Sequence, residues 1–101
     1  MNHYLTGNQV VMVNTCQVRD PVSGDLTPTN PTTVTFIRVQ ADGTTTEYTN
    51  GDPEVANPEV GTFTCSVLCD VVGKERWRCE TLGACESASE DEFDVLRSMV
   101  V

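Results

Sequence analysis

Apolar and polar residues alternate over residues 61–79, and we expect this stretch to organise the fold. Alternate residues of a β-strand point to the same face of a sheet. Five apolar residues of one parity come first: Phe63, Cys65, Val67, Cys69 and Val71. The segment 73–75 then supplies a turn, after which the alternation resumes with Trp77 and Cys79 on one side. This pattern predicts a β-hairpin with a loop of about three residues at the core of a small all-β domain.

Strands are also predicted before this hairpin. Residues 9–18 form a run rich in β-branched side chains, in which the polar Asn14 falls on the apolar face. In residues 32–40 the apolar positions change parity, which indicates either a β-bulge or a strand buried on both faces. The Asp-Gly turn at residues 41–43 leads to a short polar strand at residues 44–49, which we expect at the edge of a sheet.

Turn-forming residues separate these strands at intervals of about ten residues. The Thr- and Pro-rich segment 19–31 and the loop at residues 50–58 read as connections. The acidic segment 86–92 reads as a solvated loop or strand edge, and residues 93–96 as a closing strand. No segment predicts a helix. About seven short strands with this spacing are typical of a β-sandwich or a small barrel.

The five cysteines lie at positions 16, 65, 69, 79 and 85. Cys65 and Cys69 have a spacing found in zinc sites, but in an extended strand their sulfur atoms would be more than about 10 Å apart. A turn centred on Lys74 would place Cys69 opposite Cys79, where a disulfide can form. Residues 1–7 lack the features of a secretory signal, so we expect a reducing cytosol and free thiols that fill the core. The Cys69–Cys79 bond remains an open alternative.

Charge and motif content exclude several functions. The formal net charge is −9, with only six Lys and Arg residues, which argues against nucleic-acid binding. No apolar run approaches the roughly 20 residues that span a bilayer. The single histidine, His3, falls in a predicted terminal arm, so no catalytic triad has a structured base. Asp42, Asp52 and Asp70 do not match a calcium-loop pattern. We therefore predict no catalytic, cofactor-binding or metal-binding residue.

One basic cluster interrupts this acidic sequence. On a strand, two arginines would share the outward face while Trp77 points to the core, and arginine is common at protein interfaces. The chain also ends in an apolar tail, residues 97–101, which suggests contact with a neighbouring subunit. The candidate interface residues are Arg76, Arg78, Met99, Val100 and Val101.

Several short motifs between residues 7 and 96 carry a resemblance to one family of proteins. They are Gly7 before V-V-M at 10–12, P-T-T-V-T-F at 31–36, A-D-G-T-T-T-E-Y at 41–48, G-T-F at 61–63, the segment 73–84 around R-W-R, and residues 90–95. Together these motifs resemble small immunoglobulin-like structural proteins of tailed bacteriophages. The cysteines and the longer connection at residues 19–31 depart from the usual pattern of that family.

The resemblance implies an immunoglobulin-like β-sandwich of about seven antiparallel strands over residues 7–96. We expect an N-terminal arm at residues 1–6 and an apolar tail at residues 97–101 beside it. The implied function is that of a non-enzymatic virion component, made in the host cytoplasm, that decorates the capsid or joins head to tail. Expected partners are other virion structural proteins of the capsid, neck or tail, contacted in multiple copies, with no cofactor, nucleic acid or membrane. The alternative is a host-surface- or carbohydrate-binding module of a tail fibre or adhesin.

Overall fold

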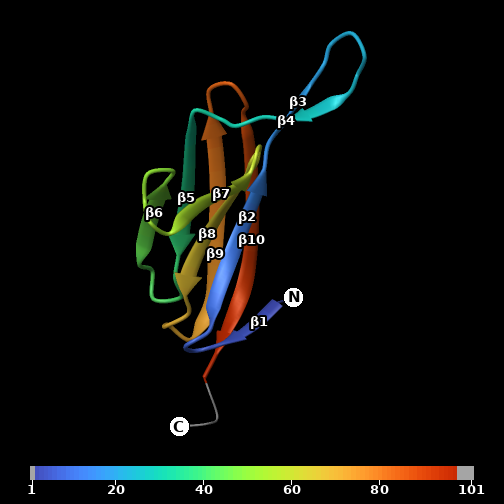
Figure 1. Cartoon of the computed structure of the whole chain (residues 1–101). Coiled ribbons are helices and arrows are strands. Elements are labelled where there is room, and N and C mark those ends of the chain that lie inside the picture. The colour runs from blue at the N-terminus through green and yellow to red at the C-terminus, as the bar shows by residue number, and fades with distance from the viewer. Residues whose placement is uncertain (1, 98–101) are drawn as a thin grey trace.

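The computed structural model describes residues 2–97, which form ten strands (Figure 1). Nothing in that range forms a helix of the length and apolarity needed to cross a membrane. The strands are β1 (Asn2–Leu5), β2 (Gln9–Thr15), β3 (Gln17–Arg19), β4 (Leu26–Pro28), β5 (Thr33–Val39), β6 (Thr45–Thr49), β7 (Val55–Glu59), β8 (Thr62–Leu68), β9 (Gly73–Leu82) and β10 (Ser87–Leu96).

Two sheets pack face to face, so the predicted all-β sandwich is confirmed. One sheet has the strand order β1-β10-β9-β5-β6, and the other has the order β2-β8-β7. A third pair, β3 and β4, projects from one end of the sandwich (Figure 1). All strand pairs are antiparallel except β1 with β10, which are parallel.

The structure has more strands than the seven expected, because short strands lie in segments that the sequence marked as connections. β4 lies within the segment 19–31, and β3 ends at its first residue. β7 begins within the loop at 50–58 and ends one residue after it. The expected N-terminal arm, residues 1–6, differs as well, since Asn2–Leu5 joins the larger sheet as β1. The acidic segment 86–92, expected as a solvated loop or strand edge, lies in β10 from Ser87 onward, where β1 leaves one edge of the strand unpaired.

The hairpin predicted for residues 61–79 is wrong. β8 pairs with β2 and β7, whereas β9 pairs with β5 and β10, so residues 69–72 cross from one sheet to the other. The crossing begins where Cys69 is held by the turn before β2: Gly7 N donates to Cys69 O (2.8 Å) and Cys69 N donates to Asn8 O (2.9 Å). Alternation directs apolar residues inward both in a hairpin and in a crossover between facing sheets, so it cannot distinguish the two.

Three cysteines fill the core as expected: Cys65, Cys69 and Cys79 are buried free thiols. The predicted placement of Cys69 opposite Cys79 is wrong, because Cys79 pairs instead with Phe36 of β5 and Ser89 of β10. The other buried apolar residues of this core are Val10, Met12, Val34, Phe36, Phe63, Val67, Phe93 and Val95.

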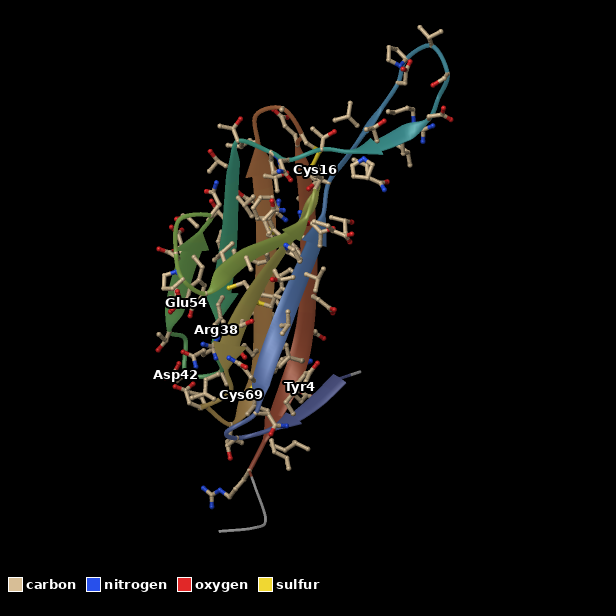
Figure 2. All side chains as sticks on the ribbon, in the orientation of Figure 1. Tyr4, Cys16, Arg38, Asp42, Glu54 and Cys69 are labelled. Atoms are coloured by element: carbon tan, nitrogen blue, oxygen red, sulfur yellow. A yellow bond between two sulfur atoms is a disulfide. The ribbon has the colours of Figure 1, made fainter. Side chains whose placement is uncertain are left out.

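The remaining two cysteines overturn the expectation that every thiol is free. Cys16 and Cys85 form a disulfide with a Cα–Cα distance of 6.2 Å, across a sequence separation of 69 residues. The bond joins the segment after β2 to the connection between β9 and β10 (Figure 2). No local spacing in the sequence indicates this pair, because the two residues meet only through the arrangement of the sheets.

Asn14, the polar residue on the apolar face of β2, is buried and bonded across the sandwich. Its Nδ2 donates to Ser87 Oγ (3.3 Å), and its Oδ1 accepts from Ser89 Oγ (2.6 Å). Ser87 N also donates to Thr81 Oγ1 (2.7 Å). Because its amide is paired, Asn14 can be buried without the cost of unsatisfied polar atoms, and its bonds join β2 to β10.

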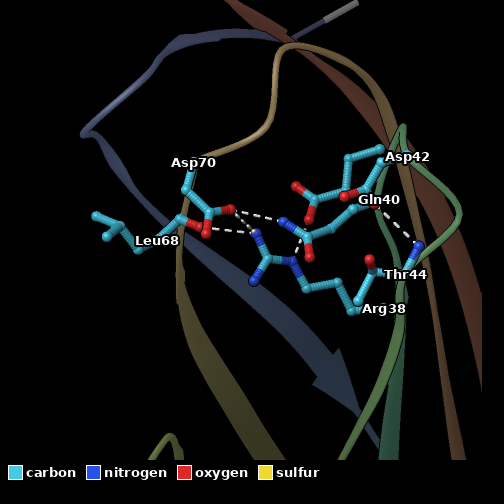
Figure 3. A network of polar contacts seen from close by, with 7 residues as sticks. Arg38, Gln40, Asp42, Thr44, Leu68 and Asp70 are labelled. Carbon is cyan, nitrogen blue, oxygen red and sulfur yellow. Dashed lines mark hydrogen bonds and ion pairs between the residues drawn. The ribbon is translucent and has the colours of Figure 1, made fainter.

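A buried ion pair lies near the opposite end of the sandwich. Arg38 points inward from β5, and its Nε donates to Glu75 Oε1 of β9. Arg38 Nη2 also donates to Leu68 O (2.7 Å) and lies 3.8 Å from Asp70 Oδ1, which accepts from Gln40 Nε2 (2.6 Å; Figure 3). Glu75 Oε2 has no hydrogen-bond partner within the described range. Burial raises the pKa of Glu75 above its ordinary value, and the bond to Arg38 opposes that shift.

The buried thiols predict a loss of stability at alkaline pH. Burial raises the pKa of Cys65 from 9.0 to about 11 and that of Cys79 from 9.0 to about 12. A pKa that is higher in the folded state stabilises the fold below pH 9, and the benefit is lost as the pH rises toward the folded value. Between pH 9 and 11 we expect each thiol to lower the free energy of unfolding by about 1.4 kcal/mol per pH unit.

Urea unfolding under nitrogen between pH 8 and 11 measures this dependence. Removing one thiol with Cys79→Ala should flatten the curve above pH 9, whatever the variant's stability at pH 8. Equal slopes in the wild type and the variant would contradict the prediction.

Candidate interaction surface

The outward face of the larger sheet carries both arginines that the sequence singled out. β9 lies between β5 and β10, and its outward residues alternate with inward ones, as the sequence predicts. Trp77 points inward and is half-buried against Phe36, with ring centroids 6.1 Å apart. The cross-strand rows on the outward face are Ile37–Arg78–Glu90 and Val39–Arg76–Glu92.

The outward face also explains the change of parity in residues 32–40. β5 pairs with both neighbours without a register shift, so it contains no bulge. Ile37 and Val39 are half-buried on the outward face, while Val34 and Phe36 fill the core. The two rows, together with Trp77 and Asp91, line a shallow depression of about 500 Å³.

The two arginines differ in whether their charges are paired with carboxylates of the same sheet. Arg78 Nε donates to Glu80 Oε1 (2.6 Å), and Arg78 Nη1 donates to Glu90 Oε1; these bonds raise the pKa of Arg78. Lys74 Nζ lies 3.4 Å from Glu92 Oε1. Within residues 2–97, Arg76 forms no side-chain hydrogen bond or ion pair. Arg76 is therefore the cation on this face that is free to bind an external carboxylate.

The other candidate interface residues, Met99, Val100 and Val101, lie outside the described residues.

The three aspartates that were considered for calcium lie apart from one another, and each bonds to another residue of the chain. Asp42 accepts from Thr44 N (2.9 Å), Asp52 accepts from Thr49 N (2.8 Å), and Asp70 contacts Arg38. In the described part of the chain, no group of three or more His, Cys, Asp or Glu side chains is placed to hold a metal ion.

A second exposed surface, which the sequence did not predict, is the projecting arm formed by residues 17–28. β3 and β4 pair with each other and belong to neither large sheet (Figure 1). All side chains of the arm are exposed, and Val22 in its turn is 95% exposed. The signal in the sequence was the turn at residues 19–25 alone, because the strands beside it have three residues each and bury no side chain.

Hydrogen bonds give the tip of the arm a defined shape. Asp20 Oδ1 accepts from Val22 N (2.8 Å) and Ser23 N (3.2 Å), and these bonds lower the pKa of Asp20. Arg19 Nη1 donates to Gly24 O (2.9 Å). An aspartate that bonds the backbone two residues ahead is a standard way to fix a turn. The arm is therefore ordered by its own contacts.

The base of the arm is tied firmly to the sandwich. Besides the disulfide of Cys16 with Cys85, Cys16 N donates to Gly61 O (2.7 Å), Thr29 N donates to Cys16 O (3.1 Å), and Gly61 N donates to Asn30 Oδ1 (2.7 Å). Gly61 has φ +83°, and a Cβ at this position would lie 2.7 Å from Cys16 O. Only glycine allows the turn before β8 to approach the arm so closely.

The order of strands in the two facing sheets defines an immunoglobulin-like β-sandwich. The chain is similar to the crystal structure of the Lin-41 filamin domain, with a TM-score of 0.62 and 22% sequence identity over 96% of this chain and 85% of that chain. At this level of identity the similarity shows the fold alone. No protein-family model matches the sequence, and no curated protein sequence matches it.

Proposed function

We propose that this chain is a non-enzymatic structural protein of a bacteriophage virion, which decorates the capsid or takes part in the head-to-tail neck by binding neighbouring virion proteins. The resemblance of the motifs between residues 7 and 96 to those of small immunoglobulin-like phage proteins supports the virion setting. The observation that carries the binding role is the arm at residues 17–28, which is ordered, projects from the sandwich and is anchored by a disulfide.

An ordered arm is well suited to binding a neighbour. A loop that already has its bound shape loses less conformational entropy on association than a flexible one. The molecule measures 56 × 26 × 22 Å, and the arm extends from one end of the sandwich (Figure 1). Val18, Val22 and Leu26 give the arm exposed apolar surface that a partner can bury. Arg76, on the larger sheet, offers a separate contact for an acidic side chain.

The chemistry of the cysteines supports a role without catalysis. A cysteine nucleophile needs an accessible thiol with a low pKa. Cys65 and Cys79 are buried, and burial raises their pKa values well above the ordinary value. Cys69 is buried with a raised pKa as well. None of these thiols has the properties of a nucleophile.

Binding to phage particles tests the proposal. Purified protein is incubated with capsids assembled without it and, separately, with host envelope material, and bound protein is quantified after sedimentation. We expect binding to capsids only. Replacing residues 18–27 by a short Gly-Ser turn should weaken capsid binding at least tenfold, because the proposed contact is removed while Cys16 and Cys85 are kept.

A matched pair of point variants serves as a control. Val22→Ser changes an exposed valine at the arm tip and should weaken binding, whereas Val72→Ser changes an exposed valine in the segment that joins the sheets and should not. Thermal unfolding checks that both variants fold. Binding to envelope material alone would contradict the proposal and support a host-surface-binding or carbohydrate-binding module instead.

A further inference from the structure

One edge of β2 is open. β2 pairs with β8 along one side, and no other strand of residues 2–97 pairs with it (Figure 1). An unpaired strand edge presents backbone donors and acceptors that a further strand can use. The sequence of this strand, Q-V-V-M-V-N-T, contains no charge and no proline.

The bonding pattern fixes which backbone groups face the open edge. In an antiparallel ladder, alternate residues bond to the neighbouring strand. Cys69 N donates to Asn8 O at the start of the ladder, and Cys16 N donates to Gly61 O at its end, so the even-numbered residues bond toward β8. The residues whose backbone N–H and C=O groups point to the open edge are therefore Gln9, Val11, Val13 and Thr15.

The other strands at sheet edges carry features that discourage pairing. β6 has Glu47 at its centre, so pairing with itself would bring two carboxylates together. β7 contains Pro58 and a register shift between Ala56 and Glu59. β1 has four residues, and the part of β10 that β1 leaves unpaired, residues 87–92, is acidic. Among the described edges, β2 alone is long, regular and uncharged.

The outward surface beside this edge is also uncharged. Val11 and Val13 are 53% and 48% exposed, and their neighbours on β8 are Ser66 and Thr64. Because the chain carries a formal net charge of −9, contact between two copies through most other surfaces brings like charges together. The residues of β2 and of β8 beside it add no charge to such a contact.

We propose that β2 pairs in antiparallel fashion with β2 of a second copy, about a two-fold axis at Met12. Gln9 then lies opposite Thr15 of the second copy, and Val11 lies opposite Val13 of the second copy. In this register all four residues that face the edge form hydrogen-bonded pairs, each of which exchanges two backbone bonds. Two Val–Val pairs form on the outward face, where cross-strand pairs of β-branched residues are favourable.

The resulting dimer has one continuous sheet built from both three-stranded sheets. The two-fold axis places the two arms at opposite ends of this sheet, so each remains available to another partner. The dimer does not depend on the virion role, because it is measured with the purified chain alone.

Sedimentation velocity over a hundredfold range of protein concentration tests the dimer. Val11→Lys and Val13→Glu should each raise the dissociation constant at least tenfold, since each replaces the Val–Val pairs by a charge facing a valine. The double variant V11K/V13E places each new lysine opposite a new glutamate in the proposed register, and should return the dissociation constant to within about threefold of wild type. Mixing the two single variants should likewise give a heterodimer. Val72→Lys, at an exposed valine in the segment that joins the sheets, should leave the dissociation constant of the dimer unchanged.

Two further measurements separate this edge from other surfaces. Val13→Pro removes an N–H that faces the edge without removing a bond to β8, so it should abolish the dimer and leave a folded monomer, as judged by circular dichroism. Amide exchange of residues 9, 11, 13 and 15 should slow as concentration rises, while that of residues 10, 12 and 14 should be slow throughout. A wild type that stays monomeric, association that no β2 variant alters, or a double variant that stays monomeric would each overturn the proposal.

Discussion

Arg38→Met is expected to lower the free energy of unfolding by about 3–5 kcal/mol at neutral pH, because it leaves the Glu75 carboxylate buried without a counter-charge. Arg38 is 7% exposed and Glu75 is 2% exposed. Glu75 already has one oxygen without a hydrogen-bond partner in the part of the chain that the structure describes. Urea unfolding at pH 7.5 measures the loss.

The loss should shrink when the solution is acidified. Without Arg38, burial and the nearby Asp70 carboxylate act unopposed on Glu75 and raise its folded-state pKa further above the unfolded value. A raised pKa stabilises the folded state at pH values below the unfolded pKa, and that contribution is lost as the pH rises through the folded value. The difference in stability between wild type and Arg38→Met should therefore be smaller at pH 5 than at pH 7.5.

Two companion variants make the interpretation specific. Arg38→Met/Glu75→Leu removes both charges and should recover most of the lost stability, since a buried ion pair is often no better than apolar packing. Arg78→Met removes the exposed ion pairs with Glu80 and Glu90 and should change stability far less than Arg38→Met, because solvent screens exposed pairs. If Arg38→Met changes stability as little as Arg78→Met does, water reaches Glu75 in the folded protein.

Removing the disulfide should have an effect of similar size. A bond that closes a loop of 69 residues restricts the unfolded chain, and the chain-entropy model gives a stabilisation of about 4 kcal/mol. We expect Cys16→Ala/Cys85→Ala to lose about that much free energy of unfolding, with measured disulfide losses in small domains ranging over about 2–5 kcal/mol. Urea unfolding without reducing agent measures the difference.

Reducing agent provides the control for this prediction. It should lower the stability of the wild type to that of the double variant and leave the variant unchanged, because the other three cysteines are free thiols. Equal stability of the wild type with and without reducing agent would mean that the bond contributes nothing to the fold. The arm should respond as well: amide exchange of residues 17–28 should become faster in the variant, since the tie at its base is lost.

The sequence predicted the local conformation of much of this chain. Alternation placed Phe63, Cys65 and Val67 in the core, and it placed Arg76 and Arg78 outward from Trp77. These predictions were correct because the direction of a side chain depends only on its position within its own strand.

The sequence did not predict which strands are neighbours. Pairing in this fold joins segments far apart in the chain, such as β2 with β8 and β5 with β9. No local pattern in the sequence indicates which of these segments pair. The crossing at residues 69–72 and the bond of Cys16 with Cys85 both follow from that pairing. The arm was missed for a different reason. Its two short strands bury nothing, so they carry no apolar alternation.

The pairing of β1 with β10 has a consequence for the order of folding. The larger sheet takes one edge strand from residues 2–5 and its neighbour from residues 87–96, so it cannot be completed until Leu96 has left the ribosome. Proteins dominated by such distant pairings fold slowly, in about milliseconds to seconds. During synthesis β2 and β8 can already pair, while β10, which contacts β2 across the sandwich, is still being made. In that interval a newly made chain exposes the apolar surface that β10 later covers, and it is most vulnerable to aggregation then.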